Sequence, residues 1–103
     1  MEQLRLISVR ELDKYVSRYP DVYLIDVRPE NEYRFSHIRH AINIPYEEGI
    51  IWKFPREKEL VVYCERGSTS MIAAREMKRA GYRVVSVSGG ISEYRGRNLV
   101  FSR

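Results

Sequence analysis

Apolar residues occur in short runs along this chain, and most of the segments between the runs have helical spacing. Near-continuous runs at residues 22–27 and 60–63 are typical of strands covered on both faces of a parallel sheet. Shorter runs at 4–7, 41–44 and 84–87 predict further strands, with 4–7 expected at an edge. The pattern therefore predicts short buried strands spread over the whole chain.

Helical patterns follow most of these runs. Ser8 and Glu11 have the form of a capping box in front of a helix at 9–18. The clearest apolar stripe lies at 70–80, and Gly81 is placed to end that helix. The other expected elements are a short helix from residue 29 to near 36, a weaker helix at 46–54, a last short helix at 91–94 and a tail at 98–103.

The alternation of strands and helices predicts an α/β fold with an open, mostly parallel sheet and helices on both faces. The chain has 103 residues, so we expect one domain over 1–103. Apolar residues make up 44% of the chain, which is enough to form a single core. The sequence contains no internal repeat and no low-complexity segment.

Charge and composition exclude several classes of partner. The net charge of +4 is modest and its basic residues are scattered, which allows small anions or an acidic partner but does not favour nucleic acid. No apolar run is long enough to cross a membrane, and the N-terminus lacks the apolar core of a signal peptide. A lone thiol survives best in a reducing compartment, so we expect a cytoplasmic protein.

The single cysteine also limits the chemistry. It excludes an internal disulfide and a zinc site built from several thiolates. His37 and His40 lie three residues apart, but two histidines make a poor metal site without further ligands. We therefore expect no metal and no cofactor.

That cysteine, Cys64, stands where the 60–63 strand is expected to end and a polar loop begins. A helical pattern follows directly, so backbone N–H groups and the positive end of a helix dipole converge near the thiol. Such surroundings stabilise the thiolate, the nucleophilic form of cysteine. The alternative is a buried, inert cysteine, a common fate of free cysteines. The order of strand, polar loop and helix favours a nucleophile.

Several motifs, taken together, resemble the two signatures of single-domain rhodaneses, the thiosulfate sulfurtransferase family. The resemblance covers nearly the whole chain and keeps the order and spacing of the motifs. The first signature resembles residues 26–33, 37–38 and 41–45, and the second resembles residues 63–70, 73–74, 81–82, 87 and 89–91. The resemblance implies a small rhodanese-like domain around a five-stranded parallel sheet.

The resemblance also implies sulfurtransferase activity. In that chemistry a cysteine thiolate attacks the outer, sulfane sulfur of a donor such as thiosulfate, and the resulting persulfide passes that sulfur to a thiophilic acceptor. The catalytic residue carried over to this chain is Cys64. The substrate-binding loop carried over consists of Glu65, Arg66, Gly67, Ser68, Thr69 and Ser70. A second interpretation stays open, a sulfur-carrier or protein-interaction module that a partner protein loads with sulfur.

One departure from the family pattern bears on the donor. Many single-domain members carry Arg at the sixth loop position, where this chain has Thr69. The loop therefore lacks one fixed cation, which fits a protein donor better than free thiosulfate. Arg66 would still favour an anionic donor, and we expect Glu65 to face solvent because it would oppose that effect.

Phosphoryl transfer is the main competing chemistry, since cysteine phosphatases use a similar loop and some share this fold. Their loop needs a cysteine, five residues and then an arginine, whose guanidinium grips the phosphate through two hydrogen bonds. In this chain that position is Ser70, and Arg66 comes too early to close the loop. Phosphatase and arsenate reductase activities therefore rank below sulfur transfer.

Asp26 and Arg28 come at the end of the 22–27 strand and are supporting residues in this interpretation. We expect Asp26 to cap the turn after its strand, and Arg28 to pair with Glu32 about one helical turn away. Sulfane transfer needs little proton chemistry beyond formation of the thiolate, so we assign no general acid or base.

Overall fold

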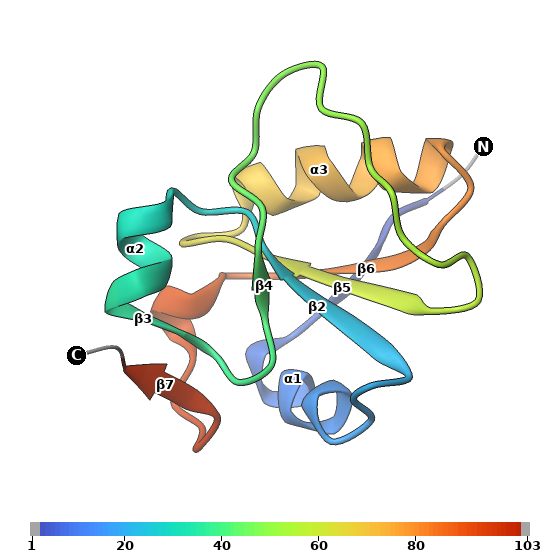
Figure 1. Cartoon of the computed structure of the whole chain (residues 1–103). Helices are drawn as coiled ribbons and strands as arrows, with labels where there is room; N and C mark the ends of the chain where they lie inside the picture. Colours follow the sequence, from blue (N-terminus) through green and yellow to red (C-terminus); the bar gives the residue numbers. More distant parts are fainter. Residues whose placement is uncertain (1–2, 102–103) are drawn as a thin grey trace.

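The computed structural model describes residues 3–101, which form a sheet with helices packed on it (Figure 1). The central sheet has five strands, all parallel, in the order β1-β6-β5-β2-β4. The strands are β1 (Arg5–Ile7), β2 (Val22–Asp26), β4 (Ile42–Asn43), β5 (Glu59–Tyr63) and β6 (Arg83–Val87). The predicted α/β fold is confirmed, and the short strand β1 lies at an edge as expected.

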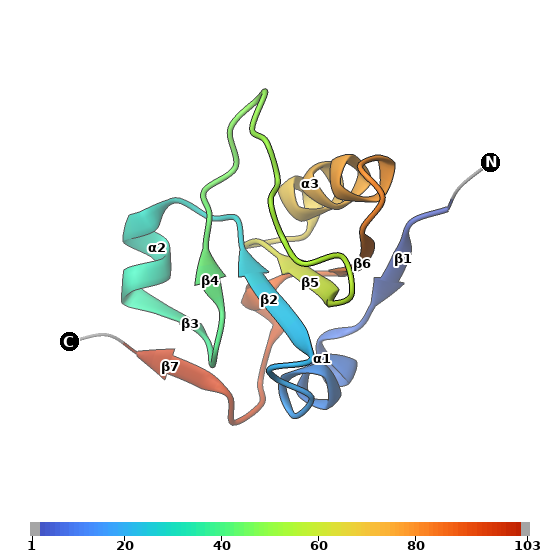
Figure 2. The ribbon, with the colours of Figure 1, turned by 45° about the vertical axis from the view of Figure 1, so that its right-hand side comes forward.

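Helices cover both faces of this sheet (Figure 2). The helix α1 (Val9–Val16) has the predicted capping box: the Ser8 hydroxyl accepts from the Glu11 N–H at 3.2 Å, and the Glu11 carboxylate accepts from the Ser8 N–H at 3.0 Å. The helix α3 (Ser68–Arg79) lies on the other face and starts two residues before the predicted helix. A short helix, α2 (Glu30–Phe35), follows β2.

Two cores separate the sheet from these helices, because its central strands are apolar on both sides. Leu60, Val61, Val62 and Tyr63 of β5 are fully buried and point alternately to the two cores. The core under α1 includes Leu12, Val16, Leu24, Val61 and Tyr63, and the core under α3 includes Ile25, Val62, Ala73, Ala74 and Met77. The near-continuous apolar runs of the sequence are thus explained by double-sided burial.

The predicted helix at 46–54 is wrong. These residues form an irregular loop between β4 and β5, in which Gly49 has a φ of 84° outside the helical region. The apolar residues that suggested a helix still pack inward in part: Trp52 is buried, whereas Ile51 is exposed. Aromatic side chains, and not a helical backbone, cover this part of the core.

The predicted tail at 98–103 is also wrong over its described part. Leu99–Phe101 forms β7, which pairs antiparallel with β3 (Ser36–Ile38) in a separate two-stranded sheet. Residues 102 and 103 lie outside the described residues. The last predicted helix is a single 3₁₀ turn at Ile91–Glu93. The strand β7 therefore lies beside β3, the short strand that follows α2 (Figure 1).

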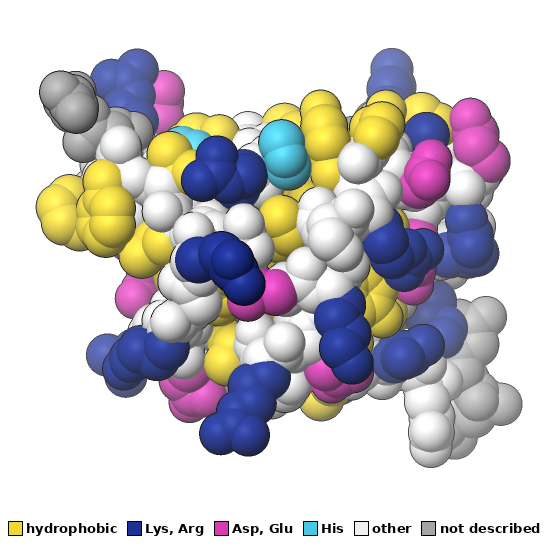
Figure 3. Space-filling model, turned by 90° about the horizontal axis from the view of Figure 1, so that it is seen from below, with side chains coloured by type: hydrophobic (Ala, Val, Ile, Leu, Met, Phe, Trp, Pro, Cys, Tyr) yellow, Lys and Arg dark blue, Asp and Glu magenta, His cyan; other side chains and the backbone are white. Residues whose placement is uncertain are grey.

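The surface agrees with the scattered charge of the sequence. On the face seen from below, Lys and Arg side chains are spread among acidic and apolar ones (Figure 3). None of the helices in residues 3–101 combines the length and the apolar character needed to cross a membrane.

Candidate active site

Cys64 follows β5 directly and lies at the N-terminus of α3. Its side chain is only 4% exposed. The sulfur accepts hydrogen bonds from the backbone N–H of Gly67 at 3.1 Å and of Ser70 at 3.3 Å. Two N–H donors and the start of a 12-residue helix therefore surround the sulfur with positive charge density, which stabilises a negative charge on it.

The turn at Gly89 and Gly90 and the two residues after it hold the loop that carries this sulfur. The Ile91 N–H donates to the Cys64 carbonyl at 3.0 Å, and the Ser92 N–H donates to the Glu65 carbonyl at 3.0 Å. Gly90 has a φ of 69°, and a Cβ there would lie 2.6 Å from the Cys64 carbonyl oxygen. Gly67 approaches Gly89 in the same way, since its Cβ would lie 3.1 Å from the Gly89 nitrogen. Only glycine fits these two contacts.

Ser70 braces the loop from inside. Its side chain is fully buried, and its hydroxyl donates to the Gly67 carbonyl at 3.2 Å and bonds the Ser86 hydroxyl at 2.9 Å. Ser70 occupies the position where a cysteine phosphatase would carry its arginine, and here that position holds a small side chain turned towards β6. The geometry therefore offers no guanidinium at this point to grip a phosphate.

The remaining loop residues differ in their access to the site. Glu65, Arg66 and Ser68 are exposed, whereas Thr69 is half-buried and lines the cavity above the sulfur. Arg66 is absent from the described residues that line this cavity. The positive charge that the sequence suggested for the loop therefore does not line this cavity.

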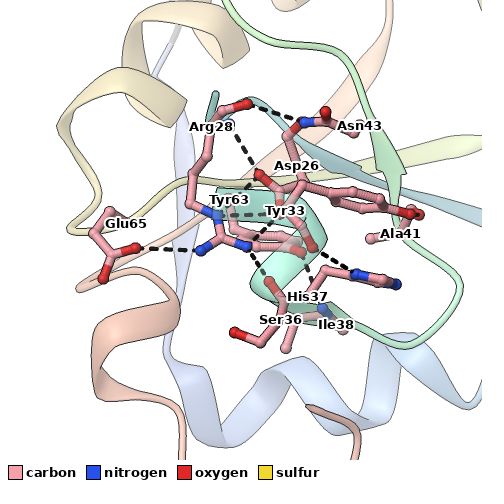
Figure 4. A network of polar contacts seen from close by, with 10 residues as sticks. All are labelled: Asp26, Arg28, Tyr33, Ser36, His37, Ile38, Ala41, Asn43, Tyr63 and Glu65. Atoms are coloured by element: carbon pink, nitrogen blue, oxygen red, sulfur yellow. Dashed lines mark hydrogen bonds and ion pairs between the residues drawn. The ribbon is translucent and has the colours of Figure 1, made fainter. Parts of the chain in front are cut away.

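Asp26 and Arg28 form a buried ion pair beside the loop (Figure 4). The Arg28 Nε and Nη2 donate to the Asp26 carboxylate at 3.1 and 2.8 Å, and the Asp26 Oδ1 also accepts from the Arg28 N–H at 2.9 Å. The Nη2 group also donates to the Ser36 carbonyl at 2.5 Å. Asp26 thus caps the turn after its strand, and Arg28 ties β2 to β3.

The predicted Arg28–Glu32 pair is wrong, because Arg28 pairs with Asp26 and with Glu65. The Nη1 group of Arg28 reaches the Glu65 carboxylate at 3.3 Å, so Glu65 is half-exposed but its carboxylate turns inward. Burial lowers the pKa of Arg28, whereas the hydrogen bonds and charge of Asp26 raise it, and the net pKa lies above the ordinary arginine value. The guanidinium therefore stays charged.

Tyr63, which sequence reasoning did not single out, supports the same network. Its hydroxyl accepts the Ile38 N–H at 3.0 Å and so links β5 to β3. Burial and the negative charge of Asp26 raise the pKa of Tyr63 far above the ordinary tyrosine value. Tyr63 therefore stays protonated. Its sequence signals were its place in an apolar run directly before Cys64 and at the start of the second signature.

The sulfur opens into a cavity of about 510 Å³. Among the described residues, its lining includes one guanidinium, from Arg28, and three carboxylates, from Glu32, Glu47 and Glu65. A second cavity of about 340 Å³ adjoins it and shares Arg28, Glu32 and Glu65. In residues 3–101, no three His, Cys, Asp or Glu side chains gather closely enough to hold a metal ion.

Comparison with known proteins agrees with this geometry. The model of the rhodanese-like domain family matches residues 8–97. A rhodanese-related protein of Thermoplasma volcanium has a similar structure, with 30% identity, a TM-score of 0.76, and coverage of 93% of this chain and 97% of that chain.

Several curated relatives carry sulfurtransferase in their names, and two of them illustrate the match. The tRNA sulfurtransferase of Desulfurococcus amylolyticus is 35% identical over 73% of this chain and 15% of its own length. The adenylyltransferase and sulfurtransferase uba4 of Ogataea parapolymorpha is 32% identical over 91% of this chain and 24% of its own length. The chain thus spans at most about a quarter of these two relatives. The family match and the solved structure together show that the chain belongs to the rhodanese-like domain family.

Proposed function

We propose that this protein is a sulfurtransferase in which Cys64 carries the transferred sulfur as a persulfide. The observation that carries the proposal is the cysteine sulfur at the floor of an open cavity, with two backbone N–H groups directed at it. Relatives named sulfurtransferases support sulfur transfer at the level of the family. A reducing, cytoplasmic location would keep this thiol free, as predicted from the single cysteine.

The transfer needs two displacements at sulfur. The Cys64 thiolate attacks the sulfane sulfur of a donor, the sulfur–sulfur bond of the donor breaks, and the rest of the donor leaves with the electron pair. With thiosulfate, the leaving group is sulfite. An acceptor such as cyanide then attacks the outer sulfur of the persulfide, and the Cys64 thiolate is restored. The N–H groups of Gly67 and Ser70 stabilise the negative charge on the Cys64 sulfur before the first displacement and again after the second.

A second candidate function is a sulfur carrier that a partner protein loads. It is favoured by the cavity lining, in which carboxylates outnumber the single guanidinium while Arg66 stays outside. A free thiosulfate dianion meets repulsion there. A persulfide presented by a partner protein carries at most one negative charge into the cavity, so it meets less repulsion than thiosulfate.

The test is to replace Cys64 by Ser and by Ala and to follow sulfur transfer from thiosulfate and from a protein persulfide. Both variants should fold, as judged by circular dichroism, and neither should form a persulfide detectable by mass spectrometry. Undiminished transfer by a folded Cys64→Ser variant would overturn the proposal. The ratio of the two donor rates in the wild type distinguishes the free sulfurtransferase from the partner-loaded carrier.

A further inference from the structure

Arg28 is the cationic side chain of the Cys64 cavity, and its hydrogen-bonding groups are already occupied. The Nε and Nη2 groups are held by Asp26, which is fully buried, so that half of the guanidinium is fixed. Arg28 lines both cavities, and its Nη1 group is held only by Glu65 among the described partners. At Nη1, Arg28 could therefore exchange Glu65 for another partner, while Asp26 keeps the rest of the guanidinium in place.

Glu65 is held more weakly than Asp26. Its side chain is 49% exposed and its contact with Arg28 is a single one at 3.3 Å. Its backbone is anchored by the hydrogen bond from the Ser92 N–H, so the carboxylate can swing without displacing the loop. In its present position the Glu65 carboxylate pairs with the Nη1 group of Arg28 (Figure 4). It also adds a third negative charge to the cavity, beside those of Glu32 and Glu47.

We propose that Glu65 determines the charge of the sulfur donor that Cys64 accepts. By masking Arg28 and adding its own charge, Glu65 disfavours sulfane donors with an anionic substituent and favours persulfides whose substituent is uncharged or cationic. The proposal rests on the proposed function and deepens it, because it names the substrate class. Removal of the Glu65 charge exposes the Nη1 group to the cavity, where it can pair with an anionic donor.

The test uses three small hydropersulfides that transfer sulfur in the same way and differ in charge. They are the persulfides of cysteamine, 2-mercaptoethanol and mercaptoacetate, generated in solution, whose substituents are cationic, uncharged and anionic. In each case the Cys64 thiolate attacks the outer sulfur, the donor sulfur–sulfur bond breaks, and the alkyl thiolate leaves with the electron pair. The rate of Cys64 persulfide formation is measured by rapid quenching and mass spectrometry.

Wild type should load fastest from the cysteamine persulfide and slowest from the mercaptoacetate persulfide. In Glu65→Gln, loading from the anionic donor should rise about fivefold relative to the uncharged donor, as expected for a partly exposed charge pair. Higher salt should reduce the differences between the donors in wild type. Glu30→Gln is the matched control, since Glu30 is an exposed partner of Arg34 on α2 outside the cavity lining. It removes the same charge and should leave the donor order unchanged.

The outcomes separate this proposal from simpler explanations. If Glu65 only positioned the loop, Glu65→Gln would slow all three donors by the same factor, and this result would overturn the proposal. An unchanged donor order, or an equal gain in Glu30→Gln, would overturn it as well. If wild type formed no Cys64 persulfide from any donor, the proposed function itself would fail, and this inference would fail with it.

Discussion

The two walls of the Cys64 cavity are held by different kinds of contact. The loop at 64–70 is held mostly by backbone groups, namely hydrogen bonds to Ile91 and Ser92 and the close approach of Gly90. The opposite wall belongs to the loop at 44–58, from which Pro45, Tyr46 and Glu47 line the cavity. This loop also has backbone bonds near its start, but aromatic side chains hold most of the rest. Trp52 stacks between Tyr46 and Phe54, with ring centroids 6.5 and 6.4 Å away.

Because the two walls are held differently, we expect substitutions in one to affect sulfur transfer and substitutions in the other to affect stability. A backbone-held wall fixes the N–H groups on the sulfur to a fraction of an ångström, so a small steric change there should harm sulfur transfer. A wall held by side-chain packing is stabilised by many contacts over a buried area. Removing a side chain there should lower the free energy of unfolding and displace the Cys64 sulfur less. The predictions below test the two walls against each other.

The largest effect is expected for Gly90→Ala. The new methyl group would overlap the carbonyl groups of Cys64 and Glu65, and the φ of 69° disfavours a side chain. The loop must move, which misplaces the N–H groups of Gly67 and Ser70. We expect Cys64 persulfide formation to fall by about 100-fold, as for an ångström-scale displacement of a catalytic group. Single-turnover loading of the folded variant checks this prediction.

Gly49→Ala is the matched control on the opposite wall. Gly49 also has a positive φ, 84°, but a Cβ there would meet no atom within 4 Å. The substitution should lower the free energy of unfolding by about 1 kcal/mol, through backbone strain alone. Its loading rate should equal that of wild type. Equal loading defects in the two glycine variants would contradict the distinction between the walls.

The second effect concerns stability. Trp52 is 8% exposed, and its indole N–H donates to Glu76 at 3.3 Å. Trp52→Ala should lower the free energy of unfolding by about 3 kcal/mol, because it removes the largest side chain of this wall and leaves a cavity. Urea denaturation measures that loss. Persulfide formation by the folded variant should fall far less than in Gly90→Ala, and a comparable fall would show that the aromatic wall also sets the sulfur geometry.

The same division explains what the sequence could predict. The parallel sheet, the capping box at Ser8 and the thiol at a strand-to-helix turn all depend on local patterns, and the structure contains each of them. The helix expected at 46–54 failed because the aromatic side chains obtain their burial from an irregular backbone. Side-chain spacing alone cannot distinguish that loop from a helix.

Contacts between segments that lie far apart in the sequence could not be predicted from local patterns. The strands β3 and β7 have three residues each and pair only with each other among the described strands, about 60 residues apart in the sequence. Arg28 illustrates the same limit at the site. Its neighbour in sequence, Glu32, was the expected partner, but the fold brings Glu65 to it across 37 residues. Local motifs identified the site residues, whereas the topology of the fold determines which residues they contact.

The smallest effect concerns Tyr63, the residue directly before the backbone-held wall. Tyr63→Phe removes the acceptor of the Ile38 N–H and should lower the free energy of unfolding at neutral pH by about 1–2 kcal/mol. Because the pKa of Tyr63 is raised in the folded protein, its contribution is complete below the ordinary tyrosine pKa of about 10. Above that pH the unfolded chain loses the proton and the folded chain keeps it, so wild type is destabilised.

Tyr63→Phe lacks this proton, whereas the other tyrosines titrate in both proteins. The stability difference between wild type and variant should therefore shrink between about pH 9 and about pH 11, by up to about 1.4 kcal/mol for each pH unit above 10. Urea unfolding of both proteins across this range measures the difference. A difference independent of pH would show that folding leaves the pKa of Tyr63 at its ordinary value, so that its hydroxyl is not shielded from solvent. The wall beside Cys64 would then be more open than its backbone contacts indicate.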